Sequence, residues 1–357
     1  MPLRAPFWWY RRRGAVAAAL APLGRLYGAR AEARFARAEP YRPRLPVICV
    51  GNFTAGGGGK TPTAIAVASL LKELGEKPAF LTRGYGGRSE GPLFVEPGQS
   101  AEQVGDEPLL LAEVAPTVVA ADRAAGAKVI EATDASVIVM DDGFQNPGIA
   151  KNLALIVVDS ESGIGNGLII PAGPLRAPLE AQVARADALL VIGDGGKAAR
   201  LADVFAAQAK PVLKARMVPR QDKRWLSVLP VIGFAGIARP EKFFATLRDN
   251  GARLIDTRAY PDHYRYSERQ ARSLLKEARD YKAMLVTTEK DYVRLPDGPE
   301  EDSARAELRH RARPFLIAVE FGEAAAAKEL LLRVFDKRQG RAILRDRRRQ
   351  DGSRDSA

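Results

Sequence analysis

The chain alternates short hydrophobic runs, rich in β-branched residues, with longer segments whose apolar residues recur at helical spacing. From residue 45 onward the short runs read LPVICVG, PAFLTRG, TVVAA, SVIVMDD, LALIVVD and ALLVIG. Segments such as TAIAVASLLKELG and DRAAGAKVIEAT separate them. Apolar runs without polar alternation indicate strands buried on both faces, and this strand–helix alternation is typical of a parallel sheet. We therefore predict an α/β fold in which a mostly parallel sheet carries helices on both faces.

A second series of the same kind begins near residue 230 with VIGFAG, RPEKFFATLRDNG, ARLIDTRAY, SERQARSLLKEARDY and AMLVTTEKD. It predicts a smaller α/β lobe, and the strand-like pieces at residues 211–218 and 314–321 are candidates for the connection between the lobes. The predicted division is an N-terminal membrane-associated segment (1–36), a larger core (37–222), a smaller lobe with linker strands (223–335) and a basic, disordered tail (336–357).

Composition limits the chemistry that such a fold can carry. A chain of 357 residues, 46% hydrophobic and 27% charged, suits two soluble globular domains. The only cysteine, Cys49, lies inside an apolar run, so we expect a buried thiol in a reducing compartment. The only histidines are His263 and His310, too few to build a zinc site of the usual kind with one cysteine. A metal ion in this protein would need carboxylate ligands.

The net charge of +12 is concentrated at the two ends of the chain. Residues 1–44 carry +8 and residues 336–357 carry +4, so the 291 residues between them are neutral overall. A neutral body with basic ends suits an anionic membrane surface at least as well as RNA. We therefore predict a membrane surface rather than a nucleic acid as the partner, and the sequence shows no sign of an obligate protein partner.

The N-terminus reads PFWWYRRR, GAVAAALAPLG and RLYGARAEARFARA, which joins aromatic residues to basic clusters and a short apolar run. The apolar run between Arg13 and Arg25 is shorter than the roughly 20 residues of a spanning helix, and Pro22 interrupts it. We expect a membrane-interface helix that makes the protein peripheral or monotopic. A cleaved signal peptide and an ordinary surface helix remain alternatives.

Residues 47–63, VICVGNFTAGGGGKTPT, have the form of a strand, a phosphate-binding loop and the start of a helix. Consecutive glycines let backbone N–H groups converge on phosphate oxygens, a lysine reaches the β and γ phosphates, and the next hydroxyl binds magnesium. The usual pattern has glycine where this chain has Thr54. The loop predicts a P-loop NTPase-like fold. The predicted ATP-binding residues are Thr54, Ala55, Gly56, Gly57, Gly58, Gly59, Lys60 and Thr61.

A partner motif for this loop is an acidic residue at the end of a buried strand, and SVIVMDDGFQ supplies Asp141 and Asp142. With Thr61, these residues are the predicted Mg²⁺ ligands. The chain lacks the Asn-Lys-x-Asp run that selects guanine in many phosphate-loop proteins, because TEKD at residues 288–291 has a different order. ATP is therefore the expected nucleotide.

Eight ordered blocks between Val50 and Asp291 resemble the tetraacyldisaccharide 4'-kinase family, the lipid A 4'-kinases of Gram-negative envelopes. The blocks are VGNFTAGGGGKTPT, LTRGYGG, GDEPLLLA, ADR, DDGFQN, PAGPLRAP, PDHY and LVTTEKD. The family loop also carries threonine where Thr54 stands. The resemblance implies ATP-dependent phosphorylation of the 4'-hydroxyl of a tetraacylated glucosamine disaccharide 1-phosphate, which gives the 1,4'-bisphosphate lipid A precursor. It places this reaction at the cytoplasmic face of the inner membrane.

The same resemblance implies roles for individual residues. It implies that Asp106 in GDEP is the base, that His263 in PDHY supports it from the smaller lobe, and that Lys60 acts on the phosphates. A site made by two lobes would close over its substrate and exclude water. From the residues alone, Asp106 is equally a helix N-cap and His263 a loop hydrogen-bonder. The implied substrate-binding residues are Arg83, Tyr85, Arg123, Gln145 and Arg176.

Two positions depart from the family pattern. Asn146 stands where the family has histidine and Ala177 where it has glutamate, so no metal or substrate role transfers to either residue. Two other functions remain open on the sequence. One is a soluble phosphate-loop ATPase or GTPase that assists cofactor or metal-centre assembly, and the other is a nucleotide-gated scaffold whose basic ends bind nucleic acid. The aromatic and basic N-terminus favours the lipid kinase over the soluble ATPase.

Overall fold

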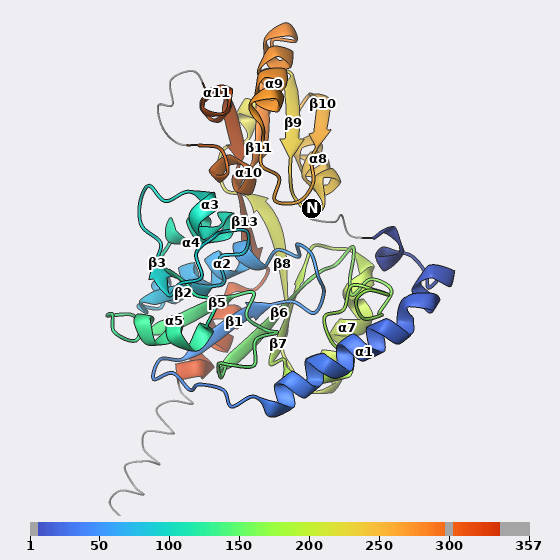
Figure 1. Cartoon of the computed structure of the whole chain (residues 1–357), viewed down its shortest axis with the longest axis vertical. Coiled ribbons are helices and arrows are strands. Elements are labelled where there is room, and N and C mark those ends of the chain that lie inside the picture. Colours follow the sequence, from blue (N-terminus) through green and yellow to red (C-terminus); the bar gives the residue numbers. More distant parts are fainter. Residues whose placement is uncertain (1–5, 297–302, 336–357) are drawn as a thin grey trace, which may run out of the picture.

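A nine-stranded sheet forms the larger lobe of the protein (Figure 1). The structure is a computed structural model that describes residues 6–296 and 303–335. The strand order is β13-β8-β7-β6-β1-β5-β2-β4-β3, and every neighbouring pair is parallel except β13–β8 and β3–β4 at the two edges. The strands are β1 (Val47–Gly51), β2 (Pro78–Thr82), β3 (Leu93–Phe94), β4 (Thr117–Val119), β5 (Val137–Asp141), β6 (Leu153–Asp159), β7 (Ala188–Ile192), β8 (Val212–Pro219) and β13 (Ile317–Phe321).

Alternate residues of the central strands supply two separate hydrophobic cores, one on each face of this sheet. On β1, Ile48 and Val50 belong to one core, and Val47 and Cys49 to the other. This division follows from the two-residue period of a strand, and it explains why the runs read as apolar throughout. The larger lobe contains the helices α2 (Lys60–Glu73), α3 (Ala101–Val104), α4 (Asp106–Ala112), α5 (Arg123–Ile130), α6 (Leu179–Arg185) and α7 (Ala199–Ala207). The predicted parallel sheet covered on both faces is confirmed.

The smaller lobe is a second parallel sheet, of strand order β10-β9-β11-β12. It too has a hydrophobic core on each face. Its elements are β9 (Val231–Ala235), α8 (Pro240–Asp249), β10 (Leu254–Ala259), α9 (Glu268–Asp280), β11 (Met284–Thr288), α10 (Glu289–Val293), α11 (Ala304–Arg311) and β12 (Ala312–Phe315). The smaller α/β lobe expected from the sequence is therefore present, and Figure 1 shows it standing on one end of the larger lobe.

Two antiparallel strands connect the lobes. The chain leaves the larger sheet after β8 and returns through β12 directly into β13, which pairs with β8 from Ile317↔Pro219 to Phe321↔Ala215. The predicted linker segment 211–218 falls on β8, and the segment 314–321 covers the end of β12 and the whole of β13. The assignment of residues through 335 to the smaller lobe needs correction, because Val319 of β13 and Leu330 in the following helical residues 324–335 share a core with β1.

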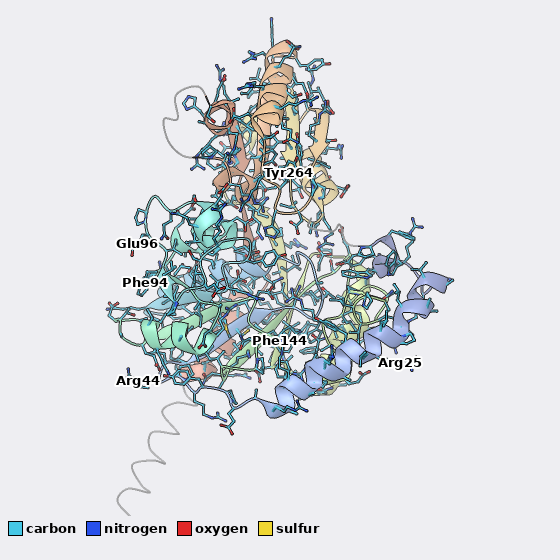
Figure 2. All side chains as sticks on the ribbon, in the orientation of Figure 1. Arg25, Arg44, Phe94, Glu96, Phe144 and Tyr264 are labelled. Carbon is cyan, nitrogen blue, oxygen red and sulfur yellow. The ribbon has the colours of Figure 1, made fainter. Side chains whose placement is uncertain are left out.

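The N-terminal helix α1 (Ala15–Arg37) lies along the larger lobe (Figure 1). Small residues allow a close approach, since a Cβ on Gly24 would lie 2.7 Å from the carbonyl oxygen of Ile169. Arg185 of α6 also pairs with Glu32 of α1 at 2.8 Å. On the outer side, the side chains of Leu23 and Leu26 are exposed, and Figure 2 shows Arg25 at the periphery. No helix within residues 6–296 and 303–335 is long and apolar enough to cross a membrane.

The aromatic cluster that precedes α1 is also tied to the larger lobe. Trp8 and Trp9, in the short 3₁₀ helix Phe7–Tyr10, both donate their indole N–H groups to the carbonyl oxygen of Pro171, at 3.2 and 3.0 Å. The sequence predicted membrane contact for this segment. The structure shows in addition that both indole groups are hydrogen-bonded to the larger lobe.

Candidate active site

The predicted phosphate loop occupies residues 52–59, between the end of β1 and the start of α2. Gly59 has a left-handed backbone (φ 85°), and a Cβ at this position would lie 2.7 Å from Met217 Cε. Glycine is therefore required where the loop turns into the helix. Lys60 and Thr61 form the first turn of α2 and are both buried. This is the arrangement in which a helix N-terminus and loop N–H groups bind an anion.

Asp141 ends β5 directly beside this turn. The hydroxyl of Thr61 donates to Asp141 Oδ2 at 2.9 Å, whereas Asp141 Oδ1 is buried with no hydrogen-bond partner in the described part of the chain. Burial, with the nearby charges of Glu107 and Asp142, raises the pKa of Asp141 to about 7. A buried carboxylate oxygen that lacks a partner suits a cation.

The Mg²⁺ ligands predicted from the sequence can be tested against this geometry. Mg²⁺ is usually held by one or two carboxylates together with substrate phosphates and waters, rather than by a complete protein cage. Among the described residues there is no cluster of three His, Cys, Asp or Glu side chains that forms such a cage. Thr61 and the free oxygen of Asp141 fit the usual arrangement.

Asp142 has a different environment from Asp141. Arg176 donates to both of its carboxylate oxygens, at 3.0 and 3.2 Å, and Lys60 Nζ lies 3.6 Å from Oδ2. Although burial opposes ionisation, the charges of Lys60 and Arg176 lower the pKa of Asp142 to about 2. Arg176 also donates to the carbonyl oxygen of Thr54 at 3.1 Å. Asp142 therefore pairs with two basic side chains, Lys60 and Arg176, beside the phosphate loop. Its carboxylate oxygens are less free to bind a metal ion than those of Asp141.

Asp106 and His263 come together from different lobes. Asp106 begins α4, and His263 lies in the loop after β10, with its Nδ1 atom 3.3 Å from Asp106 Oδ2. Arg294, at the end of α10, donates to the same oxygen through Nε at 2.8 Å and through a second, shorter contact. Burial by itself raises the pKa of Asp106. The hydrogen bond from His263 and the charges of Arg294 and Lys290 outweigh burial and hold that pKa well below its usual range.

The backbone of Gly236 fixes His263 and Arg294 relative to each other. Its carbonyl oxygen accepts from the His263 N–H at 3.0 Å and from Arg294 at 2.7 Å. Its own N–H donates at 2.9 Å to Asp291, which also accepts from Arg294 and from the Tyr266 hydroxyl. Asp291 is the last residue of the TEKD run, so this run supplies the buried carboxylate that accepts hydrogen bonds from Gly236, Tyr266 and Arg294.

The predicted substrate contacts differ in exposure and in their partners, and Tyr85 is the one that packs against His263. The Tyr85 side chain is 59% exposed, and its ring lies edge-on to His263 with 5.0 Å between the centroids. Arg123 is buried beside Arg83, and burial together with the charge of Arg83 lowers its pKa to about 10. The side-chain amide of Gln145 donates to Gln182 Oε1 at 2.5 Å, which fixes the orientation of this half-buried side chain.

A cleft of about 1340 Å³ between the lobes joins these groups. The predicted residues that line it are Ala55, Gly56, Gly57, Gly58, Gly59, Lys60, Thr61, Arg83, Tyr85, Arg123, Asp141, Asp142, Gln145, Arg176 and His263. Asp106 lies behind His263 rather than on the surface of the cleft. Thr54 does not line the cleft either, but its carbonyl oxygen accepts a hydrogen bond from Arg176, which does. At the two departures from the family pattern, Asn146 caps a turn by accepting from Gly148 N–H at 2.8 Å, and Ala177 is fully buried.

Four basic side chains of the smaller lobe were missed from the sequence. Arg239 donates to the carbonyl oxygen of Gly57 in the phosphate loop at 3.0 Å and pairs with Asp159 at 3.2 Å, and Lys242 pairs with the same carboxylate. Lys290 and Arg294 bind the consecutive acids of α4. None lies in a motif with a known phosphate-loop role, and the spacing of TEKD alone does not indicate a contact with α4.

Comparison with known proteins shows which family this chain resembles. Residues 16–336 match the family model described as tetraacyldisaccharide-1-P 4'-kinase, LpxK. A tetraacyldisaccharide 4'-kinase of Methylobacterium nodulans is 53% identical over 297 residues, 82% of this chain and 88% of the relative, and one from Rhodopseudomonas palustris is 47% identical over 92% of this chain and 95% of the relative. A crystal structure of apo-form LpxK from Aquifex aeolicus in complex with ATP superposes with a TM-score of 0.69 and 26% identity, covering 90% of this chain and 99% of that one.

Proposed function

Because this chain belongs to the tetraacyldisaccharide 4'-kinase family, we propose that the cleft between its lobes transfers the γ-phosphate of ATP to the 4'-hydroxyl of an acylated disaccharide 1-phosphate. The enzyme is a kinase of lipid A biosynthesis. The observation that carries the site assignment is that the phosphate loop and the Asp106–His263 pair meet at one cleft.

On the donor side, backbone N–H groups of residues 56–59 hold the phosphates of ATP, and Lys60 and Arg176 offset their charge. Thr61 and Asp141 are the proposed Mg²⁺ ligands, with Asp142 beside them. When bound there, the ion neutralises charge on the β and γ phosphates. Lys60 exchanges its contact with Asp142 for a phosphate oxygen, because both are anionic partners within reach of the same side chain.

On the acceptor side, the Asp106–His263 pair takes the proton of the sugar hydroxyl as its oxygen attacks the γ-phosphorus in line. The bond from the γ-phosphorus to the β–γ bridging oxygen breaks, and ADP leaves. Arg83, Tyr85, Arg123 and Gln145 are the proposed contacts to the disaccharide and its phosphate, since guanidinium groups grip phosphate through two parallel hydrogen bonds.

The lipid nature of the substrate gives the N-terminus a role. The exposed residues Leu23, Leu26 and Tyr27 of α1 stand beside basic side chains on a helix anchored to the larger lobe. We propose that this surface rests on the cytoplasmic face of the inner membrane as a peripheral contact. Deletion of residues 1–36 then shifts the protein from the membrane fraction to the soluble fraction, and unchanged partitioning would refute the contact.

The test of the activity is an assay of purified protein with ATP, Mg²⁺ and a tetraacylated disaccharide 1-phosphate in detergent. The expected product carries a new 4'-phosphate, and Asp106→Asn loses phosphoryl transfer while it still binds ATP. An enzyme that hydrolyses ATP but leaves the disaccharide unchanged would instead be a soluble-type ATPase, and the proposal would fail.

A further inference from the structure

A buried glutamine lies directly behind one of the residues that line the cleft. Gln182 of α6 is fully buried, and a buried amide is costly unless both of its ends are hydrogen-bonded. Its Nε2 atom donates to the carbonyl oxygen of Ala177 at 2.8 Å, and its Oε1 atom accepts from Gln145 Nε2 at 2.5 Å. Gln145 itself lines the cleft. Gln182 therefore connects the protein backbone to a side chain that can meet the substrate.

The carbonyl group of Ala177 fixes the orientation of both amides. A backbone carbonyl oxygen only accepts hydrogen bonds, so the atom of Gln182 that faces it is the nitrogen. The other end of Gln182 is then its oxygen, which pairs only with the nitrogen of Gln145. Within residues 6–296 and 303–335, no group donates to the remaining oxygen, Gln145 Oε1. The cleft therefore presents a hydrogen-bond acceptor of fixed orientation at this point.

Neutral groups alone set this orientation. The two positions at which the chain departs from the family pattern both adjoin the amide pair, because Ala177 accepts from Gln182 and Asn146 directly follows Gln145. The family has glutamate and histidine at these positions, whereas neither side chain ionises here. The orientation of the Gln145 amide therefore depends on hydrogen bonds and not on the charge of an acid or a histidine at either position.

The N-terminal helix holds the backbone of the same glutamine. Arg34 of α1 donates to the carbonyl oxygen of Gln145 at 2.9 Å, and Arg34 also lines the cleft. The helices α1 and α6 are themselves joined, because Arg185 pairs with Glu32 at 2.8 Å and its guanidinium lies 4.1 Å from the centroid of the Phe35 ring. Gln145 thus belongs to the part of the cleft that borders the helix proposed to rest on the membrane.

The substrate group that meets this acceptor follows from its chemistry. Ionised phosphate oxygens and ester carbonyl oxygens only accept hydrogen bonds, so neither pairs with Gln145 Oε1. A hydroxyl donates or accepts and pairs with either orientation of an amide. An acylamino N–H only donates, so it is the group for which the fixed orientation matters. The acyl chains of the substrate leave the cleft towards the membrane, and this amide joins such a chain to the sugar.

From this arrangement we infer that Gln145 Oε1 accepts a hydrogen bond from an acylamino N–H of the disaccharide, and that Gln182 is the positioning residue that turns this oxygen towards the substrate. The inference rests on the proposed kinase function and specifies one contact on its acceptor side. An enzyme with this contact discriminates against a substrate in which esters replace the amides, because Gln145 Oε1 then faces a group without a hydrogen to donate.

The test of the contact compares two substrates with the purified full-length protein, ATP and Mg²⁺ in detergent. One is the tetraacylated glucosamine disaccharide 1-phosphate, and the other has ester oxygens in place of both amide nitrogens. Gln145→Met keeps the length of the side chain and removes the acceptor. The KM for the amide substrate should rise about three- to tenfold, whereas the KM for the ester analogue should change less than about twofold. Equal losses on the two substrates would overturn the assigned ligand.

Gln182→Met tests the positioning role, because it fills a similar space in α6 and removes both hydrogen bonds. The KM for the amide substrate should rise about two- to fivefold, with kcat and the KM for ATP nearly unchanged. The effect should vanish with the ester analogue and in the double variant with Gln145→Met. A packing defect would instead lower kcat on both substrates and add to Gln145→Met, which would refute the role. Gln208→Met, exposed at the end of α7, is the matched control and should change nothing.

A conservative variant keeps the positioning role testable if Gln182→Met does not fold. In Gln182→Glu, burial keeps the carboxyl protonated near about pH 6, so its hydroxyl can donate to Ala177 while its other oxygen accepts from Gln145. This variant should retain the KM of the parent protein for the amide substrate. A tenfold rise in that KM would contradict the proposed orientation.

Failure of this inference can be told apart from failure of the proposed function. If the parent protein phosphorylates the amide substrate and Gln145→Met affects neither substrate, only the contact is wrong. If Gln145→Met instead raises the Mg²⁺ concentration needed for half-maximal activity about tenfold, Oε1 binds the metal and the contact is again wrong. If the parent protein phosphorylates neither substrate, the kinase proposal itself fails.

Discussion

The donor side and the acceptor side of the cleft are built in different ways. The donor side is one contiguous stretch, in which β1, the loop at residues 52–59 and α2 bring Lys60 and Thr61 to Asp141 on a neighbouring strand. The acceptor side is assembled across the lobe boundary, because Arg294 and Asp106 lie 188 residues apart. The larger sheet alone therefore positions Lys60, Thr61 and Asp141, whereas the Asp106–His263 pair forms only where the two lobes are in contact. Substitutions that affect one side should leave the other measurably intact.

The largest effect is expected on the donor side from Asp141→Asn. Losing the proposed metal carboxylate should reduce kcat about 10³-fold, which corresponds to the several kcal/mol that a metal supplies to phosphoryl transfer. The exposed Asp134 provides the control, as Asp134→Asn should leave kcat unchanged. Near-normal kcat in Asp141→Asn, at any Mg²⁺ concentration, would remove this residue from the metal site.

Asp141→Asn should have the opposite effect on stability. The pKa of Asp141 is raised from 3.8 to about 7, so the folded protein disfavours the ionised form and loses stability as the pH rises between these values. Without metal at pH 8, the free energy of unfolding of the variant should exceed that of the parent protein by on the order of 2–4 kcal/mol, measured by denaturant titration. The two proteins should differ little near pH 4. An equal difference at both pH values would contradict the assigned pKa.

A smaller effect is expected on the acceptor side from Lys290→Met. Lys290 binds Glu107 at 2.5 Å next to the Asp106–Arg294 contact, and burial of the ammonium is outweighed by Glu107 and Asp106, so its pKa is raised. Removing the Lys290 ammonium leaves Glu107 unpaired near Asp141 and removes one of the ion pairs that join α10 to α4. We expect kcat to fall about tenfold, with ATP affinity measured by calorimetry unchanged. Lys290→Arg should keep most of the activity, and the exposed pair Lys276–Asp280 provides a neutral control through Lys276→Met.

These two sides also differ in how far the sequence predicted them. The phosphate loop, Asp141 and the alternating strands were predictable because each depends on local spacing. The sequence named Asp106 and His263 only through family resemblance, and it gave no sign that His263 lines the cleft while Asp106 lies behind it. It missed Arg294 because nothing near residue 294 shows that its partner is at residue 106. The TEKD run served in the sequence as a family block and as evidence against a guanine motif, but nothing in it showed that Thr288 caps α10 and that Asp291 binds Arg294.

A few-fold effect is expected where the smaller lobe touches the donor side. Arg239→Ala removes the contacts to Gly57 and Asp159, so the phosphate loop loses a support from outside its own lobe. The KM for ATP should rise about three- to tenfold with a smaller change in kcat, and hydrogen exchange in the loop should increase. Arg248→Ala, exposed on the same helix, is the matched control. A kcat loss larger than the KM effect would instead place Arg239 among the groups that stabilise transferring phosphate.

The pH dependence of this contact has a definite sign. Although burial opposes ionisation, the hydrogen bond from Lys242 and the charge of Arg239 lower the pKa of Asp159 to about 2. A lowered carboxyl pKa gives stability that is complete above about pH 4 and lost only as the pH falls towards 2. The Arg239 effect on the KM for ATP should therefore be constant between pH 6 and 9, and a change of this effect within that range would contradict the lowered pKa of Asp159.

The smallest effect on catalysis is expected from Gly24→Val, which lies outside both sides. A Cβ on Gly24 would lie 2.7 Å from the backbone carbonyl oxygen of Ile169, which cannot move as a side-chain end can. The substitution should therefore displace α1 at a cost of about 1–3 kcal/mol, seen as faster proteolysis of residues 15–37. Ala19→Val on the exposed face of α1 is the control. The kcat for detergent-dispersed substrate should stay within twofold, because no catalytic contact depends on Gly24. If kcat instead falls tenfold, the position of α1 affects the cleft. The hydrogen bond from Arg34 on α1 to the carbonyl oxygen of Gln145, at 2.9 Å, is then the contact to remove next.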